Sequence, residues 1–370
     1  MKKTIVISAV NLNHGGTLTI LRDCLQFLSI FSVENNYKIV AIVFDKNLAF
    51  YPNIEYIETK WPKKRWLNRL WFEYISMKRI SKKLGPVYLW FSLHDTSPYV
   101  LATNQAVYCH SPFLFYKANF KELFLTPKIF AFSLFTRYIY RTNIKSNNYI
   151  VVQQEWIRNK MSKIYNLNLS KIVVALPISN KEILYTDSKK FNSYTFVYAS
   201  SPNTHKNFEV LCEAVYILNY KRKIDNFKLS ITVKGDENNY AKFLFNNWAH
   251  KCPNINFIGF LNQSELYNLY NNSDCLVFPS KIETWGLPIS EFSQFNKPML
   301  LADLPYAHET AAGAKLVCYF NPESAEELAQ KMEDLISGNT SILNEQPQIK
   351  YDEPVAKDWE ELFEILLKSN

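Results

Sequence analysis

Glycine and cysteine are scarce in this chain. Only eight glycines and six cysteines occur among its 370 residues, whereas glycine usually makes up about 7% of a protein. The cysteines are scattered, without the close pairs typical of a disulfide framework or a zinc site. We therefore expect buried thiols in a reducing compartment, and glycines where the backbone geometry demands them.

Long hydrophobic runs are also missing. No stretch of about 18 uninterrupted apolar residues occurs, which argues against a conventional transmembrane helix. Residues 1–16 combine basic residues with a short apolar run, but no small-residue cleavage site follows, so they predict a first strand rather than a signal peptide. With 48% hydrophobic residues and a length typical of two domains, the chain is expected to be a folded, cytoplasmic, two-domain protein.

Acidic residues are rare in the first half of the chain. Residues 1–180 contain 24 Lys and Arg against nine Asp and Glu, whereas the remaining residues contain 18 against 25, so the formal charge of +8 conceals an asymmetry. A basic half predicts an anionic partner, which could be nucleic acid, a membrane surface or a phosphate-bearing acceptor. Charge alone does not choose among them.

Strand-like and helix-like segments alternate along both halves. Strands are expected at 4–10, 38–44, 87–92, 105–109, 149–153, 172–176, 195–199, 228–233, 255–258, 275–278 and 299–302. Helices are expected at 17–31, 63–83, 127–145, 207–220, 240–250, 264–271, 288–294, 325–337 and 355–368. This order predicts an α/β protein with two doubly wound parallel sheets. The domains are expected at 1–177 and 178–350, and the helix 355–368 is a candidate to pack back on the first.

The most informative motif is FPSKIETWGLPISE at 278–291. It places Glu283 and Glu291 eight positions apart across a strand-to-helix turn. Pro288 suits the first helical turn, and Gly286 permits close approach of the backbone to a ligand. The free N–H groups at such a helix start favour anions, and the glutamates can accept hydrogen bonds from ligand hydroxyls. The alternative is that both are solvated surface charges.

This motif resembles the Glu–seven residues–Glu signature of retaining nucleotide-sugar glycosyltransferases of family 4, the group 1 glycosyltransferases. The resemblance is strong over 195–335 and weak and positional over 1–180. It implies the GT-B fold, in which two Rossmann-like domains face each other across a cleft. Further segments follow in the family's order and spacing: 199–211, 254–260, 264–270, 273–280 and 296–303 in the second half, and 151–157 in the first.

The resemblance also implies roles for particular residues. Lys206 would neutralise the leaving diphosphate, Glu291 would bind the ribose of the nucleotide, and Glu283 would face the donor sugar. His110 would touch that sugar from the first domain. The remaining donor-binding candidates are Gly15, Gly16, Ser200, Ser201, His205, Gly259, Phe260, Leu261, Thr284, Trp285, Gly286 and Leu287. In retaining members the leaving phosphate itself takes the acceptor proton, so no protein nucleophile is implied.

Two departures from the family pattern concern the donor site. The family usually has an arginine a few residues before its lysine, but 199–206 reads ASSPNTHK, without one. His205, Ser200 and Ser201 are the candidates to replace it, although a histidine is often uncharged near neutral pH. The triplet after the first glutamate has become Thr-Trp-Gly. No Asp-x-Asp tripeptide occurs, so we expect no metal and no cofactor.

Residues 59–83 form a basic and aromatic segment. They contain nine Lys and Arg and one acid, Glu73. Its apolar residues fall at helical spacing: Trp66, Leu67, Leu70, Trp71, Tyr74 and Ile75. A basic amphipathic helix with tryptophans is typical of binding to anionic membrane surfaces. The alternative is that the apolar stripe packs on the sheet. No nucleic-acid recognition motif accompanies the charge, so nucleic acid is not expected as a partner.

The sequence thus predicts a retaining transferase that moves a hexose from a nucleoside-diphosphate sugar to a glycan acceptor. The acceptor is expected to be lipid-linked, as in O-antigen, capsule or cell-wall synthesis, with the enzyme peripheral at the inner face of the cell membrane. Two alternatives stay open: a catalytically idle GT-B binding module, and a sugar-nucleotide epimerase or phosphorylase-like enzyme. The donor base, sugar, linkage and oligomeric state are not predicted.

Overall fold

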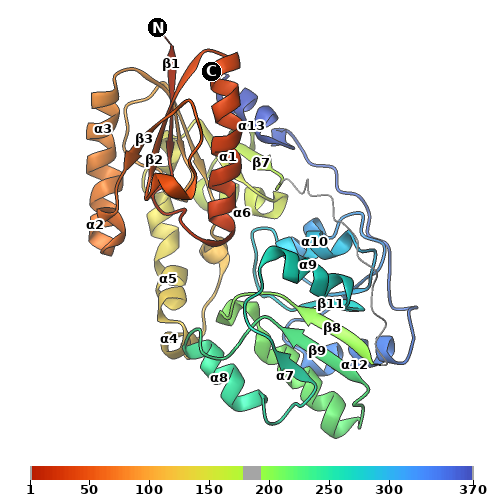
Figure 1. Cartoon of the computed structure of the whole chain (residues 1–370). Coiled ribbons are helices and arrows are strands. Elements are labelled where there is room, and N and C mark those ends of the chain that lie inside the picture. Colours follow the sequence, from red (N-terminus) through yellow and green to blue (C-terminus); the bar gives the residue numbers. More distant parts are fainter. Residues whose placement is uncertain (1, 178–192, 369–370) are drawn as a thin grey trace. The chain divides into compact units, whose positions relative to one another are not determined.

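The structure, a computed structural model, describes residues 2–177 and 193–368. Contacts divide the chain into two compact units (Figure 1). Unit 1 comprises residues 1–114, 135–178 and 351–370, and unit 2 comprises 115–134 and 179–350. The sequence suggested a single division at 177/178. The structure differs in that residues 115–134 group with unit 2, whereas the C-terminal residues group with unit 1, as the candidate packing of the helix 355–368 implied.

Unit 1 is built on an eight-stranded sheet. Its strand order is β14-β7-β6-β5-β4-β1-β2-β3, and all pairings between these strands are parallel. The strands are β1 (Lys3–Ser8), β2 (Tyr37–Val43), β3 (Ile54–Glu58), β4 (Val87–Ser92), β5 (Asn104–Tyr108), β6 (Tyr149–Val152), β7 (Ile172–Ala175) and β14 (Val355–Ala356). The order reverses between β1 and β4, as it does in doubly wound sheets.

Helices cover both faces of this sheet. They are α1 (Gly15–Glu34), α2 (Trp66–Trp71), α3 (Met77–Leu84), α6 (Glu155–Tyr165) and α13 (Trp359–Leu366), and a π-helical turn, Phe72–Ser76, joins α2 to α3. Successive residues of β1 point to opposite faces. Ile5 and Ile7 therefore join the core that includes α1 and α13, whereas Val6 joins the core with Phe72 and Met77. Burial on both faces explains the continuous apolar runs of the strands.

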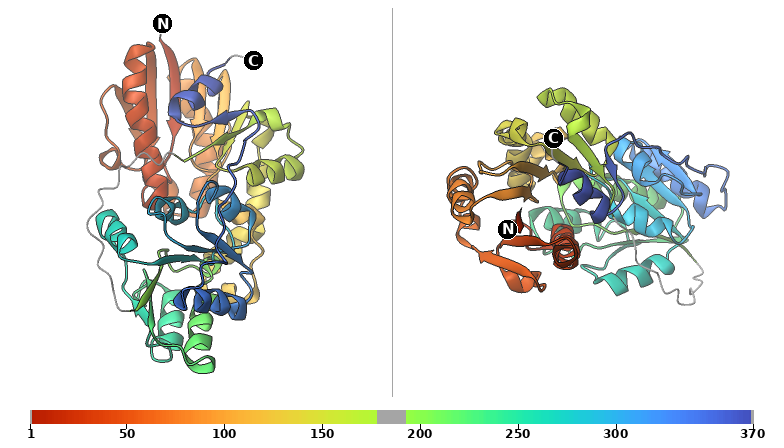
Figure 2. Two further views of the ribbon diagram at one scale, coloured as in Figure 1. Left: turned by 90° about the vertical axis from the view of Figure 1, so that its right-hand side faces the viewer. Right: turned by 90° about the horizontal axis from the view of Figure 1, so that it is seen from above.

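The C-terminal segment completes unit 1. β14 pairs with β7, and α13 packs beside α1, where the ring centroids of Phe363 and Phe27 lie 5.6 Å apart (Figure 2). The buried Arg158 of α6 fixes the residues that precede β14. Its guanidinium donates hydrogen bonds to the carbonyls of Asp352 and Glu353, each at 2.6 Å. The helix expected at 355–368 is thus α13, preceded by a short strand.

Unit 2 has a six-stranded parallel sheet of order β10-β9-β8-β11-β12-β13. Its strands are β8 (Tyr194–Tyr198), β9 (Phe227–Ile231), β10 (Ile255–Phe257), β11 (Cys275–Phe278), β12 (Met299–Ala302) and β13 (Val317–Phe320). Its helices are α4 (Phe120–Leu125), α7 (Phe208–Tyr216), α8 (Asn239–Trp248), α9 (Gln263–Asn271), α10 (Leu287–Ser293), α11 (Pro305–Thr310) and α12 (Ala325–Ile336). A π-helical turn, Ile217–Lys221, extends α7. The α/β class predicted from the sequence is confirmed.

The remaining elements are connections. α5 (Pro127–Arg141) begins in unit 2 and ends in unit 1. Short 3-10 turns occur at Lys46–Leu48, Trp61–Lys63, Pro112–Phe115, Ile144–Ser146, Leu169–Lys171 and Thr204–Lys206.

Several elements differ from the sequence expectation. The strands β3 and β13 and the helices α4, α6 and α11 were not predicted. Gly15 and Gly16 were expected in a loop before a helix at 17–31, but they form the first turn of α1, where Gly15 has φ = 60°. Within the described residues, α1 is also the one helix long and apolar enough, by length and composition, to cross a membrane. A search for uninterrupted apolar runs missed it.

Candidate active site

The candidate site of unit 2 lies where the strand order reverses. β8 and β11 are neighbours, with β9 and β10 on one side and β12 and β13 on the other. In a parallel sheet the loops that follow such a pair of strands are carried at the same edge, where ligands commonly bind. These two loops, 199–207 and 279–286, contain half of the site residues that the sequence predicted.

An ion pair joins the two loops. The ammonium of Lys206 donates to Oε1 of Glu283 at 2.5 Å. Both side chains are largely buried, with 15% and 13% of their surface exposed. The structure thus brings together a cation and a carboxylate that lie 77 positions apart in the sequence, and leaves both within reach of solvent.

The backbone around Lys206 is fixed by neighbours. Its carbonyl accepts a hydrogen bond from the hydroxyl of the fully buried Tyr198 at 2.8 Å. The next residue, Asn207, has the left-handed conformation, φ = 59°. Its side-chain amide donates to the carbonyls of Pro279 and Pro322 at 3.1 and 2.7 Å. Asn207 therefore links the lysine loop to the loop that carries Glu283.

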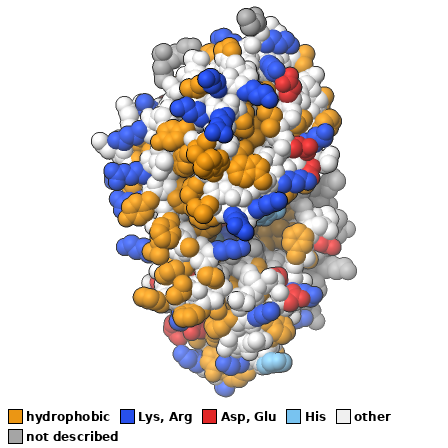
Figure 3. Space-filling view, turned by 90° about the vertical axis from the view of Figure 1, so that its left-hand side faces the viewer, with side chains coloured by type: hydrophobic (Ala, Val, Ile, Leu, Met, Phe, Trp, Pro, Cys, Tyr) orange, Lys and Arg blue, Asp and Glu red, His pale blue; other side chains and the backbone are white. Residues whose placement is uncertain are grey.

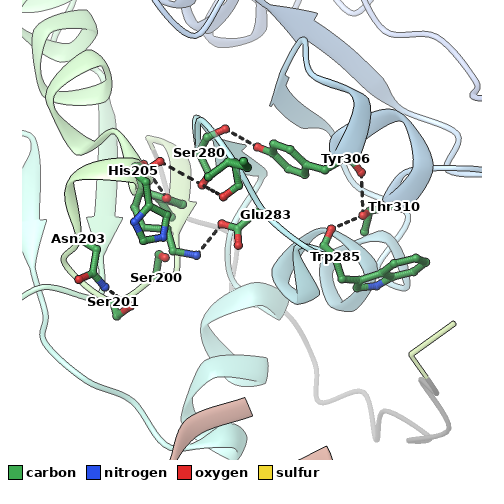
Figure 4. A network of polar contacts seen from close by, with 12 residues as sticks. Ser200, Ser201, Asn203, His205, Ser280, Glu283, Trp285, Tyr306 and Thr310 are labelled. Carbon is green, nitrogen blue, oxygen red and sulfur yellow. Dashed lines mark hydrogen bonds and ion pairs between the residues drawn. The ribbon is translucent and has the colours of Figure 1, made fainter. Parts of the chain in front are cut away.

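A second link runs through the carbonyl of His205. This oxygen accepts hydrogen bonds from the backbone N–H of Lys281 at 2.8 Å and from the hydroxyl of Ser280 at 3.3 Å. The carbonyl of Ser280 accepts in turn from Tyr306 at 2.6 Å (Figure 4). Because the polar groups are buried, each unmade bond would cost about 1–3 kcal/mol. The two loops are thus held in one arrangement.

The turn before α10 requires glycine at one position. Gly286 has φ = 93°, and an added Cβ would lie 3.3 Å from Cδ1 of Ile289. The carbonyl of Trp285 accepts a hydrogen bond from the hydroxyl of Thr310, and its indole N–H donates to Ser290 at 3.3 Å. Pro288 lies in the first turn of the helix, as expected. These contacts fix the Thr-Trp-Gly turn beside Glu283 (Figure 4).

Glu291 lies in the middle of α10, half-buried. The hydroxyl of Tyr270 points at its Oε2, at 3.5 Å. Burial, with the Glu291 charge as the next cause, raises the pKa of this tyrosine well above its ordinary range, so Tyr270 stays a hydrogen-bond donor. The two glutamates thus occupy different settings: Glu283 is paired with an ammonium, and Glu291 lies beside a phenol.

His205 is not a cation in this site. Burial, and then the neighbouring Lys206 charge, lowers the pKa of the His205 imidazole well below its ordinary range. His205 therefore does not replace the missing arginine as a charge. Ser200 donates its backbone N–H to Thr232 at 2.8 Å, and the hydroxyl of Ser201 accepts from Asn203 at 3.0 Å. These serines shape the loop that follows β8.

The remaining predicted residues of unit 2 are Gly259, Phe260, Leu261, Thr284 and Leu287. Gly259, Phe260 and Leu261 follow β10, an edge strand separated from β11 by β9 and β8. Phe260 is 88% exposed. Thr284 is half-buried on the Glu283 loop, and Leu287 is the exposed first residue of α10. Their role in binding a donor stays a prediction.

His110 belongs to unit 1 and follows β5. The carboxylate of Asp95 accepts hydrogen bonds from the backbone N–H groups of His110 and Ser111, at 2.5 and 3.0 Å. Burial lowers the pKa of the His110 imidazole, despite the opposing effect of the Asp95 charge. Gly15 and Gly16 are exposed at the start of α1, which follows β1. In unit 1 Gly15 and Gly16 thus follow β1, one of the two strands between which the order reverses, whereas His110 follows β5, the neighbour of β4.

Sequence reasoning missed the residues that support the lysine and glutamate loops. These are Tyr198, Asn207, Ser280, Tyr306 and Thr310. One signal was available, because an asparagine after a short turn readily adopts the left-handed conformation. The tyrosine and serine contacts depend on tertiary packing. Among the described residues, no group of three or more His, Cys, Asp or Glu side chains is placed to hold a metal ion.

Comparison with known proteins points to the family that the motif at 278–291 resembles. Residues 181–351 match the family described as "Glycosyl transferases group 1". The O-antigen chain mannosyltransferase RfbU of Salmonella typhimurium (strain LT2) is 26% identical over 291 residues, which are 77% of this chain and 76% of that protein.

Two solved structures show the fold. Sucrose-phosphate synthase from Thermosynechococcus elongatus superposes with a TM-score of 0.65 at 12% identity, covering 92% of this chain and 91% of that one. Anabaena HepE, in complex with UDP and glucose, gives 0.60 at 12% identity, covering 91% of each chain.

The chain is therefore a glycosyltransferase with the GT-B fold. The resemblance to the group 1 glycosyltransferases that the sequence predicted is confirmed, and it lies in the half of the chain that carries Lys206, Glu283 and Glu291.

Proposed function

We propose that this enzyme transfers a hexose from a nucleoside-diphosphate sugar to a glycan acceptor, with retention of the anomeric configuration and without a metal ion. The Lys206–Glu283 pair carries the proposal. It provides a largely buried ammonium at the sheet edge where ligands bind in such folds. Partial burial strengthens its attraction for an anion relative to water.

In this proposal Lys206 binds the diphosphate and stabilises the charge that develops on the leaving oxygen. Glu283 holds the ammonium in place before the donor arrives, and then faces the hydroxyls of the donor sugar. Glu291 binds the ribose, and His110 contacts the sugar as a neutral imidazole, in keeping with its lowered pKa. The leaving phosphate accepts the proton of the attacking hydroxyl, so that no side chain becomes covalently bound.

The proposed acceptor is a lipid-linked glycan of the O-antigen or lipopolysaccharide type. The name of the 26% identical relative, an O-antigen chain mannosyltransferase, supports this choice. It also makes mannose the first hexose to test. The binding of a nucleotide sugar is supported by the HepE complex, which contains UDP and glucose.

The experiment is turnover of a panel of nucleoside-diphosphate hexoses with lipid-linked acceptors by the wild type and by the variants Lys206→Ala and Glu291→Ala. Loss of one oriented charge or donor from a transition state typically lowers kcat by about 10²–10³-fold. We expect such a loss for Lys206→Ala, and a raised donor KM for Glu291→Ala. Lys315→Ala, at an exposed lysine just before β13 of the same unit, is the matched control. Unchanged rates and donor KM in both site variants would refute the assignment.

We further propose that unit 1 binds the anionic inner face of the cell membrane. The alternative is that the apolar stripe of 59–83 packs on the sheet. It fits the half-buried Leu70, Tyr74 and Ile75. It does not fit Trp66, Leu67 and Trp71, which are exposed. Figure 3 shows hydrophobic side chains interspersed with Lys and Arg on the face that carries this segment. Exposed tryptophans beside basic residues favour an interface with lipid headgroups.

A shallow hollow of about 300 Å³ adjoins these residues. It is lined by Tyr74, Ile75, Lys78, Arg79, Lys82 and Leu101. Its lining combines three cationic side chains with three aromatic or aliphatic ones, which suits a lipid surface rather than a water-soluble partner.

A further inference from the structure

A segment from the first half of the chain lies in unit 2. Residues 115–134 follow β5 and the His110 loop, but their contacts are with the nucleotide-sugar half of the chain. The segment contains α4 and the beginning of α5. It carries two buried polar side chains, Glu122 and Thr126. Buried polar groups in native structures are satisfied by specific partners, and here the partners indicate what the segment does.

Hydrogen bonds to the carboxylate of Glu122 hold the residues of this segment together. One carboxylate oxygen accepts a hydrogen bond from the hydroxyl of Tyr116, and the other accepts from the backbone N–H of Asn119 at 3.1 Å. Asn119 and Glu122 together form a capping box at the start of α4. Reciprocal bonds of this kind fix the first turn of a helix. Residues 116–126, which we term the donor-loop clasp, are therefore folded around one carboxylate.

The donor-loop clasp contacts the residues directly before Lys206. The hydroxyl of Thr126 is hydrogen-bonded to that of Thr204 at 2.9 Å, and both threonines are buried. The ring of Tyr116 meets the ring of His205 edge to face, with 6.1 Å between centroids. Thr204 and His205 are the first two residues of the 3-10 turn that ends at Lys206. The turn is thus held by the clasp at its start and by Tyr198 at its end.

The threonine pair is well suited to positioning. A lysine side chain is long and flexible, so the place of its ammonium depends on a fixed backbone. A hydrogen bond between two buried hydroxyls is costly to break, because neither group can turn to water. Without it, one of the contacts that hold the turn would be lost, and the Lys206 ammonium would be placed less precisely.

We propose that the donor-loop clasp is a positioning element for the nucleotide-sugar donor: Thr126 and Tyr116 hold Thr204 and His205 so that Lys206 meets the diphosphate. This inference rests on the proposed function. It assigns Thr126, a residue outside the motif-bearing half of the chain, to donor recognition. The clasp also gives the buried, neutral His205 a role. The imidazole ring of His205 packs against Tyr116, in the stretch where the family usually has an arginine.

The experiment compares Thr126→Val, Thr204→Val and the double variant, because valine keeps the shape of threonine and removes the hydroxyl. Each single variant should lower kcat/KM for the donor about two- to tenfold, the equivalent of one net hydrogen bond, and should leave the acceptor KM unchanged. Each should also lower the melting temperature. In the double variant the melting temperature should recover, because no hydroxyl is left unpaired, whereas kcat/KM for the donor should stay low.

Thr136→Val, at a buried threonine of α5 in unit 1, is the matched control and should leave kcat/KM for the donor unchanged. Donor kinetics that recover together with stability in the double variant would assign the pair a merely structural role and overturn the proposal. Unchanged donor kinetics in the single variants, with a wild type that turns over the donor, would also overturn it while leaving the proposed function intact. A wild type that binds no nucleoside diphosphate would overturn both.

Discussion

Two buried histidines of this enzyme are held in the neutral form. Burial is the largest cause of the lowered pKa of both His205 and His110. In the donor loop this leaves Lys206 as the cation beside the neutral ring, whereas the sequence alone admitted His205 as a replacement for the missing arginine. The pattern ASSPNTHK identified the loop but not the burial of its histidine, which depends on the packing of Tyr116.

The neutral histidines predict a pH dependence of stability. In the unfolded chain a histidine gains a proton as the pH falls through its ordinary range, whereas the buried ring stays neutral. Unfolding therefore takes up a proton. The free energy of unfolding decreases as the pH is lowered, by at most about 1.4 kcal/mol per pH unit for each such histidine. Urea unfolding at pH 7.5 and 5.5 should show a smaller loss for His205→Gln than for the wild type.

The control is His250→Gln, at an exposed histidine of the same unit, which should lose as much stability as the wild type. An equal loss in His205→Gln and the wild type would contradict a neutral, buried His205.

At the scale of elements, the sequence predicts the strands and helices that have strong periodicity. The buried strands β1, β2 and β4 appear as apolar runs, and α12 has a clear amphipathic pattern. β3 was missed because Glu55 and Glu58 interrupt its apolar residues, whereas the apolar run of β13 was overlooked. α6 was missed because it begins at Glu155, just past the strand expected at 149–153, in a stretch to which no helix was assigned.

The site, like the fold, was predictable in part: the residues that stand in motifs were found, and those that support them were not. Lys206, Glu283 and Gly286 stand in recognisable motifs, and the parallel topology brings their loops to one edge. The left-handed turn at Asn207 was predictable. Its hydrogen-bond partners, like that of Thr126, are distant in the sequence and were not predictable. Only the fold brings these partners together.

The C-terminal helix provides a test at this scale. Phe363 of α13 is fully buried, and its ring centroid lies 5.6 Å from that of Phe27 and 5.9 Å from that of Phe91. Phe363→Ala should lower the free energy of unfolding by about 3–5 kcal/mol, measured by urea denaturation. Glu364→Ala, at the exposed next position of the same helix, should change it by less than about 0.5 kcal/mol. A Phe363→Ala variant as stable as Glu364→Ala would show that α13 does not complete the core of unit 1.

At the scale of the whole molecule, charge is divided between the halves of the chain. The first 180 residues are strongly basic and the remainder is acidic. In unit 1 the exposed Trp66 and Trp71 stand beside basic residues, whereas the buried Glu73 pairs with the buried His94 at 3.1 Å. The single acid of 59–83 is thus withdrawn from the surface, which leaves that face more positive than the sequence indicates.

From this basic and aromatic surface we expect the protein to bind anionic vesicles, which a sedimentation assay measures. The wild type should pellet with vesicles that contain anionic phospholipid at low salt, less at high salt because ions screen the attraction, and not with neutral vesicles. The Trp66→Ala/Trp71→Ala variant should pellet less, whereas Phe50→Ala, at another exposed aromatic of unit 1, should behave as the wild type. Failure of the wild type to pellet with anionic vesicles at low salt would contradict the membrane proposal.

The central claim is that Lys206 and the Glu283 loop bind the diphosphate of the donor. Its most direct measurement is a crystal structure of the wild type with a nucleoside-diphosphate sugar that it binds. We predict diphosphate oxygens within hydrogen-bond distance of the Lys206 ammonium, next to the turn at Gly286. A diphosphate bound in unit 2 away from both would contradict the account.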